Sequence, residues 1–187
     1  MTCAYRADKS GAGEQRLVPP PASRPMYSGE VRATITTNLG PLVVVLDADR
    51  APCTVHSFAH LVREDYYTET TCHRITTEGL WVLQCGDPTG TGTGTPGYRY
   101  DEENLPIGLS PAYRRGKLAM ANAGPGTNGG QFFIVYRDSD IAPDYTVFGE
   151  VVSGLDVVER VAAAGTNTGE PDGRPALDIE ITSLSIE

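Results

Sequence analysis

Residues 120–134 read MANAGPGTNGGQFFI, a run of small and turn-forming residues that ends in two aromatic rings. The run holds four glycines and one proline before Gln131, Phe132 and Phe133. Successive side chains of a strand point to opposite faces, so one phenylalanine should enter the core and the other should face out. Glycine lets another chain approach the backbone closely. The stretch therefore predicts a strand that follows a glycine-rich loop, with one ring available beside that loop.

The chain that carries this stretch has the size of one ordinary domain, with 187 residues of which 40% are apolar. Its net charge is −9 and it has no run of lysines or arginines. Such a surface repels phosphate backbones, so nucleic acid is not an expected partner. No apolar run is long enough for a membrane span, and the first residues lack the apolar stretch of a signal peptide. We expect a monomer in the cytoplasm, or alternatively a soluble extracytoplasmic domain of a longer anchored protein.

Residues 1–29 have the composition of a flexible tail. Glycine, proline, serine and charged residues dominate, and three consecutive prolines favour an extended, unpacked backbone. Order should begin near residue 30, because VRATITT at 31–37 alternates apolar and polar residues as a strand does. We therefore predict a tail over 1–29 and one folded domain over 30–187.

Short apolar runs rich in β-branched and aromatic residues predict further strands. In the last of them the apolar spacing shifts between Ile181 and Leu184, which indicates a β-bulge. The runs are PLVVVLD at 41–47, LWVLQC at 80–85, GKLAMA at 116–121, QFFIVY at 131–136, YTVFGEV at 145–151 and ALDIEITSLSIE at 176–187.

Two segments have the period of an amphipathic α-helix. One is APCTVHSFAHLVRE at 51–64, where Pro52 and Thr54 suit a helix start. The other is SGLDVVERVAAAG at 153–165, with Ser153 as the expected N-cap. Many short strands with two helices indicate a mainly β fold, an antiparallel barrel with helical plugs.

The string GTGTPG at 92–97 has the spacing of a dinucleotide-binding loop, but no helix start follows it and no lysine accompanies it. We predict a flexible surface loop there.

Cys53, His56 and His60 could place three metal ligands on one side of a helix, although histidines on a polar helix face are usually just solvated. The GxSxG motif of hydrolases is absent. The metal site therefore stands as a minor alternative.

The chain has four cysteines, Cys3, Cys53, Cys72 and Cys85. The simplest interpretation is four buried or unreactive thiols. The alternative is one disulfide, between Cys53 and Cys72, in an oxidising compartment. Sequence alone does not establish the geometry that a disulfide needs, so both interpretations stay open.

Two long segments, CHRITTEGLWVLQCGD at 72–87 and MANAGPGTNGGQFFI at 120–134, resemble the signature segments of cyclophilins, the cyclosporin-type peptidyl-prolyl isomerases. YTVFGEV at 145–151 is similar to the family's strand after the active-site loop. The resemblance runs from about Val31 to the C-terminus and implies an eight-stranded antiparallel closed β-barrel capped by two α-helices. It also implies a groove on the outer face of the barrel, isomerase activity on proline-containing peptides and on unfolded or partly folded proteins, and no cofactor.

The family's functional positions carry over onto single residues of this chain. Three match catalytic positions: the arginine donor is Arg74, the glutamine near it is Gln84, and Asn122 would hold the substrate backbone. The family also implies a pocket for the proline ring and a neighbouring pocket. Their residues here are Trp81, Val82, Ala121, Ala123, Gln131, Phe133, Ile141 and Tyr145.

Three features depart from the family pattern. Arg74 and Gln84 are separated by two more residues than in common eukaryotic members, which bears on the alignment of Trp81. The tryptophan that is frequent in the loop before the last strand of the site is absent, and only Ile141 is available there, so we expect weakened binding of cyclosporin A. Cys85 stands where glycine is usual, and together these features resemble an actinobacterial-type member.

The chemistry of prolyl isomerisation explains why an arginine is needed. Rotation about an X-Pro amide breaks resonance, at a barrier of about 18–20 kcal/mol, and makes no covalent bond. The twisted proline nitrogen regains a lone pair, so a fixed donor such as Arg74 stabilises only the twisted state. The main alternative is a binding module that holds proline-containing segments without turnover. The other alternative is a metal-dependent protein that uses Cys53, His56 and His60.

Overall fold

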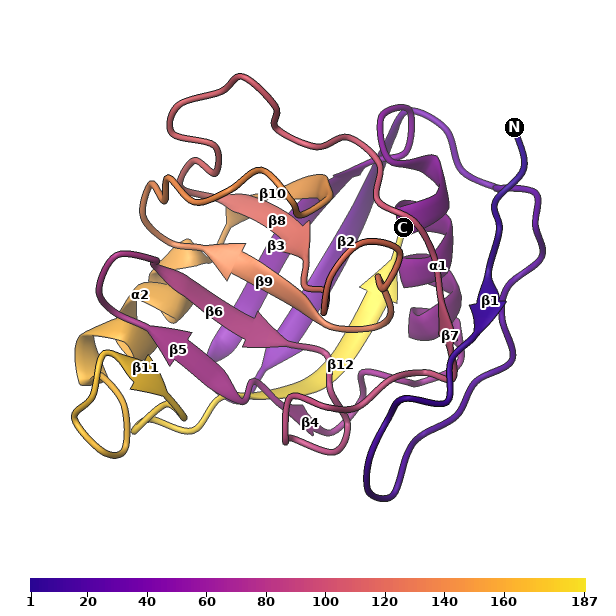
Figure 1. Cartoon of the computed structure of the whole chain (residues 1–187). Helices are drawn as coiled ribbons and strands as arrows, with labels where there is room; N and C mark the ends of the chain where they lie inside the picture. The colour runs from indigo at the N-terminus through magenta and orange to yellow at the C-terminus, as the bar shows by residue number, and fades with distance from the viewer.

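The computed structural model describes residues 1–187 and contains one large β-sheet that curls around the core (Figure 1). Two helices, α1 (Pro52–Arg63) and α2 (Leu155–Ala164), lie on opposite sides of it. Neither helix has the length and apolar character that crossing a membrane would require. The strands of the sheet are β2 (Glu30–Thr37), β3 (Gly40–Asp47), β4 (Thr70–Thr71), β5 (Arg74–Thr76), β6 (Val82–Cys85), β8 (Lys117–Met120), β9 (Phe132–Val135), β10 (Val147–Ser153), β11 (Asp172–Gly173) and β12 (Glu180–Ile186).

The strands pair antiparallel in the order β11-β5-β6-β9-β8-β10-β3-β2-β12-β4, and the segment 70–76 joins the two ends of this order. Within that segment, β4 pairs with β12 and β5 pairs with β6, and only Cys72 and His73 separate β4 from β5. If β4 and β5 count as one interrupted strand and the two-residue β11 is left aside, eight strands remain. The predicted mainly β barrel with two helices is therefore confirmed, with a strand count that differs only in detail.

The alternation of apolar residues in the sequence matches the burial of the strands. In β2 every second residue from Val31 to Ile35 is 5% exposed or less, which places one face of the strand in the core. In β12 the pairing with β2 shifts register between Ile181 and Ser183. The bulge predicted from the shifted apolar spacing is therefore confirmed.

Both helices occur where predicted, and α1 begins at Pro52 as expected, but no side chain caps its first turn from Thr54. At the start of α1 the Thr54 N–H donates to the carboxylate of Glu103, 2.6 Å away, which comes from a distant loop. The N-cap of α2 is Gly154 rather than Ser153. Gly154 has a φ of 91°, and a Cβ there would lie 2.1 Å from the carbonyl oxygen of Pro41. Glycine is required at this position because the turn packs directly on β3.

The N-terminal segment, residues 1–29, packs against the barrel, so the prediction of a flexible tail is wrong. Its strand β1 (Arg6–Ala7) pairs with β7 (Tyr98–Arg99), and Figure 1 shows the segment beside α1. His56 and His60 of α1 donate hydrogen bonds of 2.9 and 2.8 Å to backbone carbonyls of its proline-rich part. These partners lie far from the segment in sequence. The composition of the segment alone therefore does not reveal them.

Two disulfides join the four cysteines, Cys3 with Cys53 and Cys72 with Cys85. Both predictions about the cysteines are wrong, because no thiol is free and Cys53 is not bonded to Cys72. The antiparallel pairing of β5 with β6 brings Cys72 beside Cys85. The packing of the N-terminal segment on α1 brings Cys3 to Cys53, the second residue of that helix. Both pairings are consequences of tertiary contacts rather than of sequence spacing.

Candidate active site

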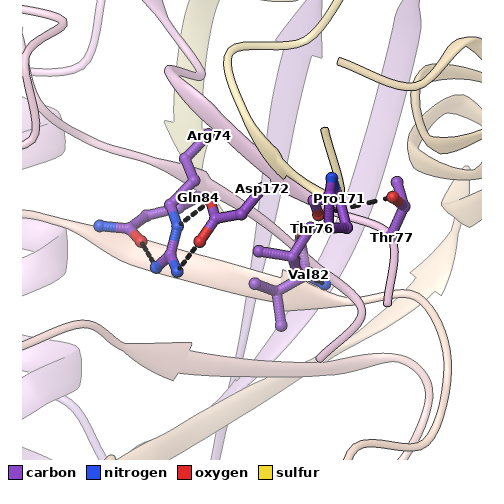
Figure 2. A network of polar contacts seen from close by, with 7 residues as sticks. All are labelled: Arg74, Thr76, Thr77, Val82, Gln84, Pro171 and Asp172. Atoms are coloured by element: carbon purple, nitrogen blue, oxygen red, sulfur yellow. Dashed lines mark hydrogen bonds and ion pairs between the residues drawn. The ribbon is translucent and has the colours of Figure 1, made fainter. Parts of the chain in front are cut away.

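Arg74 lies at the start of β5 and is held by polar partners on two sides (Figure 2). Its Nε and Nη2 donate hydrogen bonds to the two carboxylate oxygens of Asp172, each 2.8 Å long, and its Nη1 donates to Gln84 Oε1 at 3.2 Å. A guanidinium has five N–H groups, so two remain for another molecule. The hydrogen bonds to Asp172 raise the pKa of Arg74, and they lower the pKa of Asp172. Arg74 therefore presents a fixed positive charge.

No sequence pattern identifies Asp172 as part of this site. Asp172 lies 98 residues from Arg74 in sequence. It belongs to β11, which pairs with β5 and places Asp172 opposite Thr76. The Thr77 N–H donates to the Pro171 carbonyl oxygen at 2.8 Å and fixes the same crossing. The Thr77 hydroxyl also lies 3.4 Å from that oxygen, the contact drawn in Figure 2. Pairing between two distant segments thus builds what we call the arginine clamp: Arg74 with its partners Asp172 and Gln84.

Two glutamine side chains connect the arginine clamp to a neighbouring loop. Gln84 Nε2 donates to Gln131 Oε1 at 2.8 Å. Gln131 Nε2 in turn donates to the carbonyl oxygens of Gly92 and Gly94, at 3.0 and 3.1 Å. The amide of Gln84 is therefore fixed from both ends, and its oxygen is directed toward Arg74.

The buried carboxylate of Asp87 holds this loop in place. It accepts hydrogen bonds of 2.7 to 3.0 Å from the backbone N–H groups of Thr89, Gly92 and Gly94 and from the Thr89 hydroxyl. Burial by itself would raise the pKa of Asp87, but these hydrogen bonds outweigh burial and the pKa is lowered. Residues 92–97 form a loop as predicted, and the hydrogen bonds that hold it come from Asp87, which lies outside that string.

An apolar hollow of about 120 Å³ opens beside Arg74. The ring of Phe133 is 5% exposed and meets the rings of Tyr145 and Tyr113 edge to face, at 5.5 and 5.9 Å between centroids. The neighbouring ring of Phe132 is fully buried in the core, so the predicted division of the two phenylalanines is confirmed. The hollow is lined by Arg74, Leu80, Val82, Gln84, Ala121, Asn122, Phe133, Ile141 and Tyr145.

Trp81 is a predicted pocket residue that the structure places elsewhere. Its ring lies under the guanidinium of Arg137, 4.7 Å from the guanidinium carbon, and Leu80 lines the hollow instead. Side chains alternate along an extended chain, so Leu80, Val82 and Gln84 share one face and Trp81 faces the other way. The assignment of both Trp81 and Val82 to one wall was wrong because adjacent residues cannot share a face. The same alternation is the sequence signal that identifies Leu80.

Asn122 follows β8 and lies at the rim of the hollow. Its backbone N–H and C=O form no hydrogen bond within the protein. Its side chain is engaged internally: Nδ2 donates to the Asp144 carbonyl oxygen at 3.0 Å, and Oδ1 accepts from the Gly124 N–H at 3.1 Å. The side chain therefore holds the loop before Tyr145, while the backbone groups are available to an extended peptide.

A second hollow, of about 350 Å³, adjoins the apolar one. Three residues, Gln84, Ala121 and Asn122, line both, so the two hollows lie side by side, and we refer to them together as the groove. The predicted residues Ala123 and Gln131 line the second hollow rather than the first. Its other lining residues are Asp8, Ser10, Gly92, Thr93, Gly94, Thr95, Thr127, Gly129 and Gly130.

The residues of the alternative metal site have other partners. Cys53 is in a disulfide, and the Nε2 atoms of His56 and His60 donate to the backbone oxygens of Ala22 and Pro19. No group of three or more histidine, cysteine, aspartate or glutamate side chains is arranged to hold a metal ion. These three residues therefore fix the N-terminal segment to α1.

Comparisons with known proteins agree with this groove. Residues 32–186 match the protein-family model described as "Cyclophilin type peptidyl-prolyl cis-trans isomerase/CLD". A Mycobacterium tuberculosis protein named "Probable peptidyl-prolyl cis-trans isomerase B" is 42% identical over 196 residues, which cover 99% of this chain and 64% of that protein. This chain thus spans about two thirds of the mycobacterial relative. "Peptidyl-prolyl cis-trans isomerase B" of Streptomyces anulatus is 36% identical, over 84% of this chain and 97% of that protein.

A solved structure has the same fold. The crystal structure of a cyclophilin type peptidyl-prolyl cis-trans isomerase from Cryptosporidium parvum, in the presence of the dipeptide Ala-Pro, gives a TM-score of 0.72 at 31% identity. The similarity covers 83% of this chain and 98% of that chain. The mycobacterial and Streptomyces relatives also confirm the predicted likeness to actinobacterial members. The chain belongs to the cyclophilin-type peptidyl-prolyl cis-trans isomerase family.

Proposed function

We propose that this domain is a peptidyl-prolyl cis-trans isomerase that binds an X-Pro segment in the groove and speeds rotation about its amide. The observation that carries the proposal is a guanidinium with two free N–H groups at the rim of an apolar hollow. The proline ring enters the hollow over Phe133, and Arg74 faces the amide nitrogen. The substrates are proline-containing peptides and unfolded or partly folded proteins.

Arg74 acts by binding the twisted amide more tightly than the planar one. The proline nitrogen of the twisted amide is pyramidal and accepts a hydrogen bond, whereas the planar amide nitrogen does not. An interaction present only in the transition state lowers the barrier. One preorganised donor contributes about 3–4 kcal/mol by analogy with oxyanion holes, which corresponds to a rate gain of about a hundredfold to a thousandfold.

The other groove residues hold the two sides of the amide. Leu80, Val82 and Phe133 grip the proline ring by apolar contact, and the backbone groups of Asn122 pair with the substrate backbone. Fixing the reacting groups in this way lowers the entropy cost of reaching the transition state. Asp172 and Gln84 are positioning residues, because they touch Arg74 and hold its guanidinium in place.

NMR exchange spectroscopy on a short Ala-Pro peptide tests this proposal. We expect the wild-type protein to speed cis/trans exchange far above the uncatalysed rate, which has a time constant on the order of 10–100 s. Arg74→Ala should lose about a hundredfold to a thousandfold of kcat/KM. The matched control is Arg50→Ala, which removes an exposed arginine whose ion-pair partner is Asp47, outside the groove.

The same experiment separates an enzyme from a binding module. If the peptide binds, as seen by chemical-shift changes at groove residues, but exchange is no faster, the groove is a recognition surface and the isomerase proposal is wrong. If Arg74→Ala retains full acceleration, the domain is an isomerase but the proposed role of the guanidinium is wrong.

We also propose that the domain works in an oxidising compartment, as a soluble extracytoplasmic domain, rather than in the cytoplasm. The support is that all four cysteines are paired in disulfides, which persist in oxidising surroundings and are rare in the cytosol. Alkylation of free thiols in intact cells before lysis tests this. Full protection of the four cysteines is expected, and labelling of reduced cysteines would place the domain in the cytoplasm.

A further inference from the structure

We propose that the second hollow of the groove binds a lysine or arginine side chain of the substrate, and that Asp8 of the N-terminal segment selects it. This inference rests on the proposed function, because it states which substrate residue the isomerase prefers close to the proline. Asp8 lies outside residues 32–186, which match the family model, so the selecting group belongs to this chain's own N-terminal segment.

Asp8 is the only charged residue that lines the second hollow. The other lining residues are glycines, alanines, threonines, a serine and neutral amides. A side chain that enters the hollow therefore meets neutral groups and one carboxylate. A long aliphatic stem with a cationic end matches this arrangement, because lysine and arginine pack their stems on a surface while the charged end finds a polar partner.

The N-terminal segment holds the Asp8 carboxylate in place. The Ser10 N–H and the Ser10 hydroxyl both donate to Asp8 Oδ1, at 2.9 and 2.6 Å. The Asp8 N–H donates to the Gly97 carbonyl oxygen at 2.9 Å, directly after β1 pairs with β7. The disulfide from Cys3 to Cys53 ties the same segment to α1. The carboxylate is thus presented by an anchored backbone.

The charges around Asp8 leave its carboxylate ionised and without a direct ion pair. Partial burial acts to raise the pKa of Asp8, but the hydrogen bonds from Ser10, the nearby charge of Arg99 and a hydrogen bond from Thr95 together outweigh it and lower the pKa. Arg99 forms no ion pair with Asp8, and the neighbouring cation Arg6 is paired with Asp101 at 2.7 Å. Arg99 weakens the attraction that a substrate cation feels, but it does not occupy the carboxylate.

The groove gives a substrate side chain access to Asp8. The apolar hollow and the second hollow share Gln84, Ala121 and Asn122, so a peptide with its proline in the first has a neighbouring residue at the second. The net charge of −9 adds a long-range attraction for basic peptides. The expected substrate class is therefore an X-Pro segment with a basic residue close to the proline.

A set of Ala-Pro peptides that carry lysine, glutamate or an uncharged residue at each neighbouring position tests the inference by NMR exchange spectroscopy. The readout is the ratio of kcat/KM for the lysine peptide to that for the glutamate peptide, which cancels any general change in activity. An exposed ion pair gives a preference of about twofold to fivefold. We expect this preference at one position in the wild type, and its decrease with added salt.

Asp8→Asn should lower the ratio at that position to its value at the other positions, and Asp8→Lys should lower it further. The matched control is Glu14→Gln, which removes an acidic side chain of the same segment that lines a separate hollow. The inference is overturned if no position in the wild type has a higher ratio than the others, or if that excess survives in Asp8→Asn. Failure of the wild type to accelerate exchange in any peptide would instead overturn the proposed function.

Discussion

Replacing Asp172 by asparagine tests whether the arginine clamp contributes to the reaction. Asp172 contacts Arg74 through two hydrogen bonds of 2.8 Å and lies on the side of the guanidinium away from Gln84 (Figure 2). Asparagine has one carbonyl oxygen and no charge, so it accepts at most one of these bonds well. Because both side chains are partly exposed, at 39% and 54%, the ion pair contributes about 1 kcal/mol or less to the stability of the fold.

The expected loss of activity follows from the freedom that Arg74 regains. An arginine side chain carries about 2 kcal/mol of rotamer entropy, and the bidentate contact holds the inner part of the guanidinium. Asparagine removes about half of that contact, so ordering the Arg74 side chain in the transition state should cost about 1 kcal/mol more. This cost corresponds to a loss of about fivefold in kcat/KM. The loss should fall mainly on kcat, because the donor acts in the transition state. It should stay well below the loss in Arg74→Ala.

A double-mutant cycle in the NMR exchange assay separates positioning from a general structural effect. In the Arg74→Ala background, Asp172→Asn should cause no further loss, because the carboxylate acts only through the guanidinium. Asp172→Glu should restore part of the activity, and Asp178→Asn, an exposed change in the same C-terminal segment, should be neutral. Equal losses in both backgrounds, or no loss in the wild-type background, would refute the reasoning.

Three further changes have outcomes that the structure predicts. Cys3→Ser opens a disulfide that spans 50 residues, so the free energy of unfolding in urea should fall, by up to about 4 kcal/mol on the chain-entropy account; an unchanged midpoint would contradict this. Burial lowers the pKa of His56 and of His73, so the free energy of unfolding should be highest above the unfolded pKa of about 6.5 and should fall as the pH drops below it. Urea titrations at about pH 7.5 and about pH 5.5 measure this decrease, and equal values at the two pH values would contradict it. Ile141→Trp adds about 60 Å² of apolar contact beside the proline hollow, so calorimetry should show cyclosporin A binding about tenfold more tightly, and equal affinity would show that Ile141 does not limit drug binding.

The sequence by itself determined the longer strands and both helices, and its resemblance to a known family indicated most of the groove. Alternation along the chain predicts that one of Phe132 and Phe133 enters the core and that the other faces out, and the family resemblance implies that Phe133 is the one at the pocket; Phe132 is buried in the core and Phe133 lines the hollow. The same rule assigns Leu80 rather than Trp81 to the lining, as observed, whereas the family resemblance implied Trp81. These features are local, since the direction of a side chain along a strand depends only on its own position.

Tertiary structure alone decided that Asp172 contacts Arg74, which cysteines pair, and that residues 1–29 pack on the barrel. Asp172 reaches Arg74 across 98 positions of sequence, and Cys3 reaches Cys53 across 50. The N-terminal segment has the composition of a spacer, yet it packs on α1 and brings Asp8 to the groove. Contacts of this kind depend on which distant segments the barrel brings together, because each is stabilised only after the surrounding pairing has formed. Local periodicity carries no information about them.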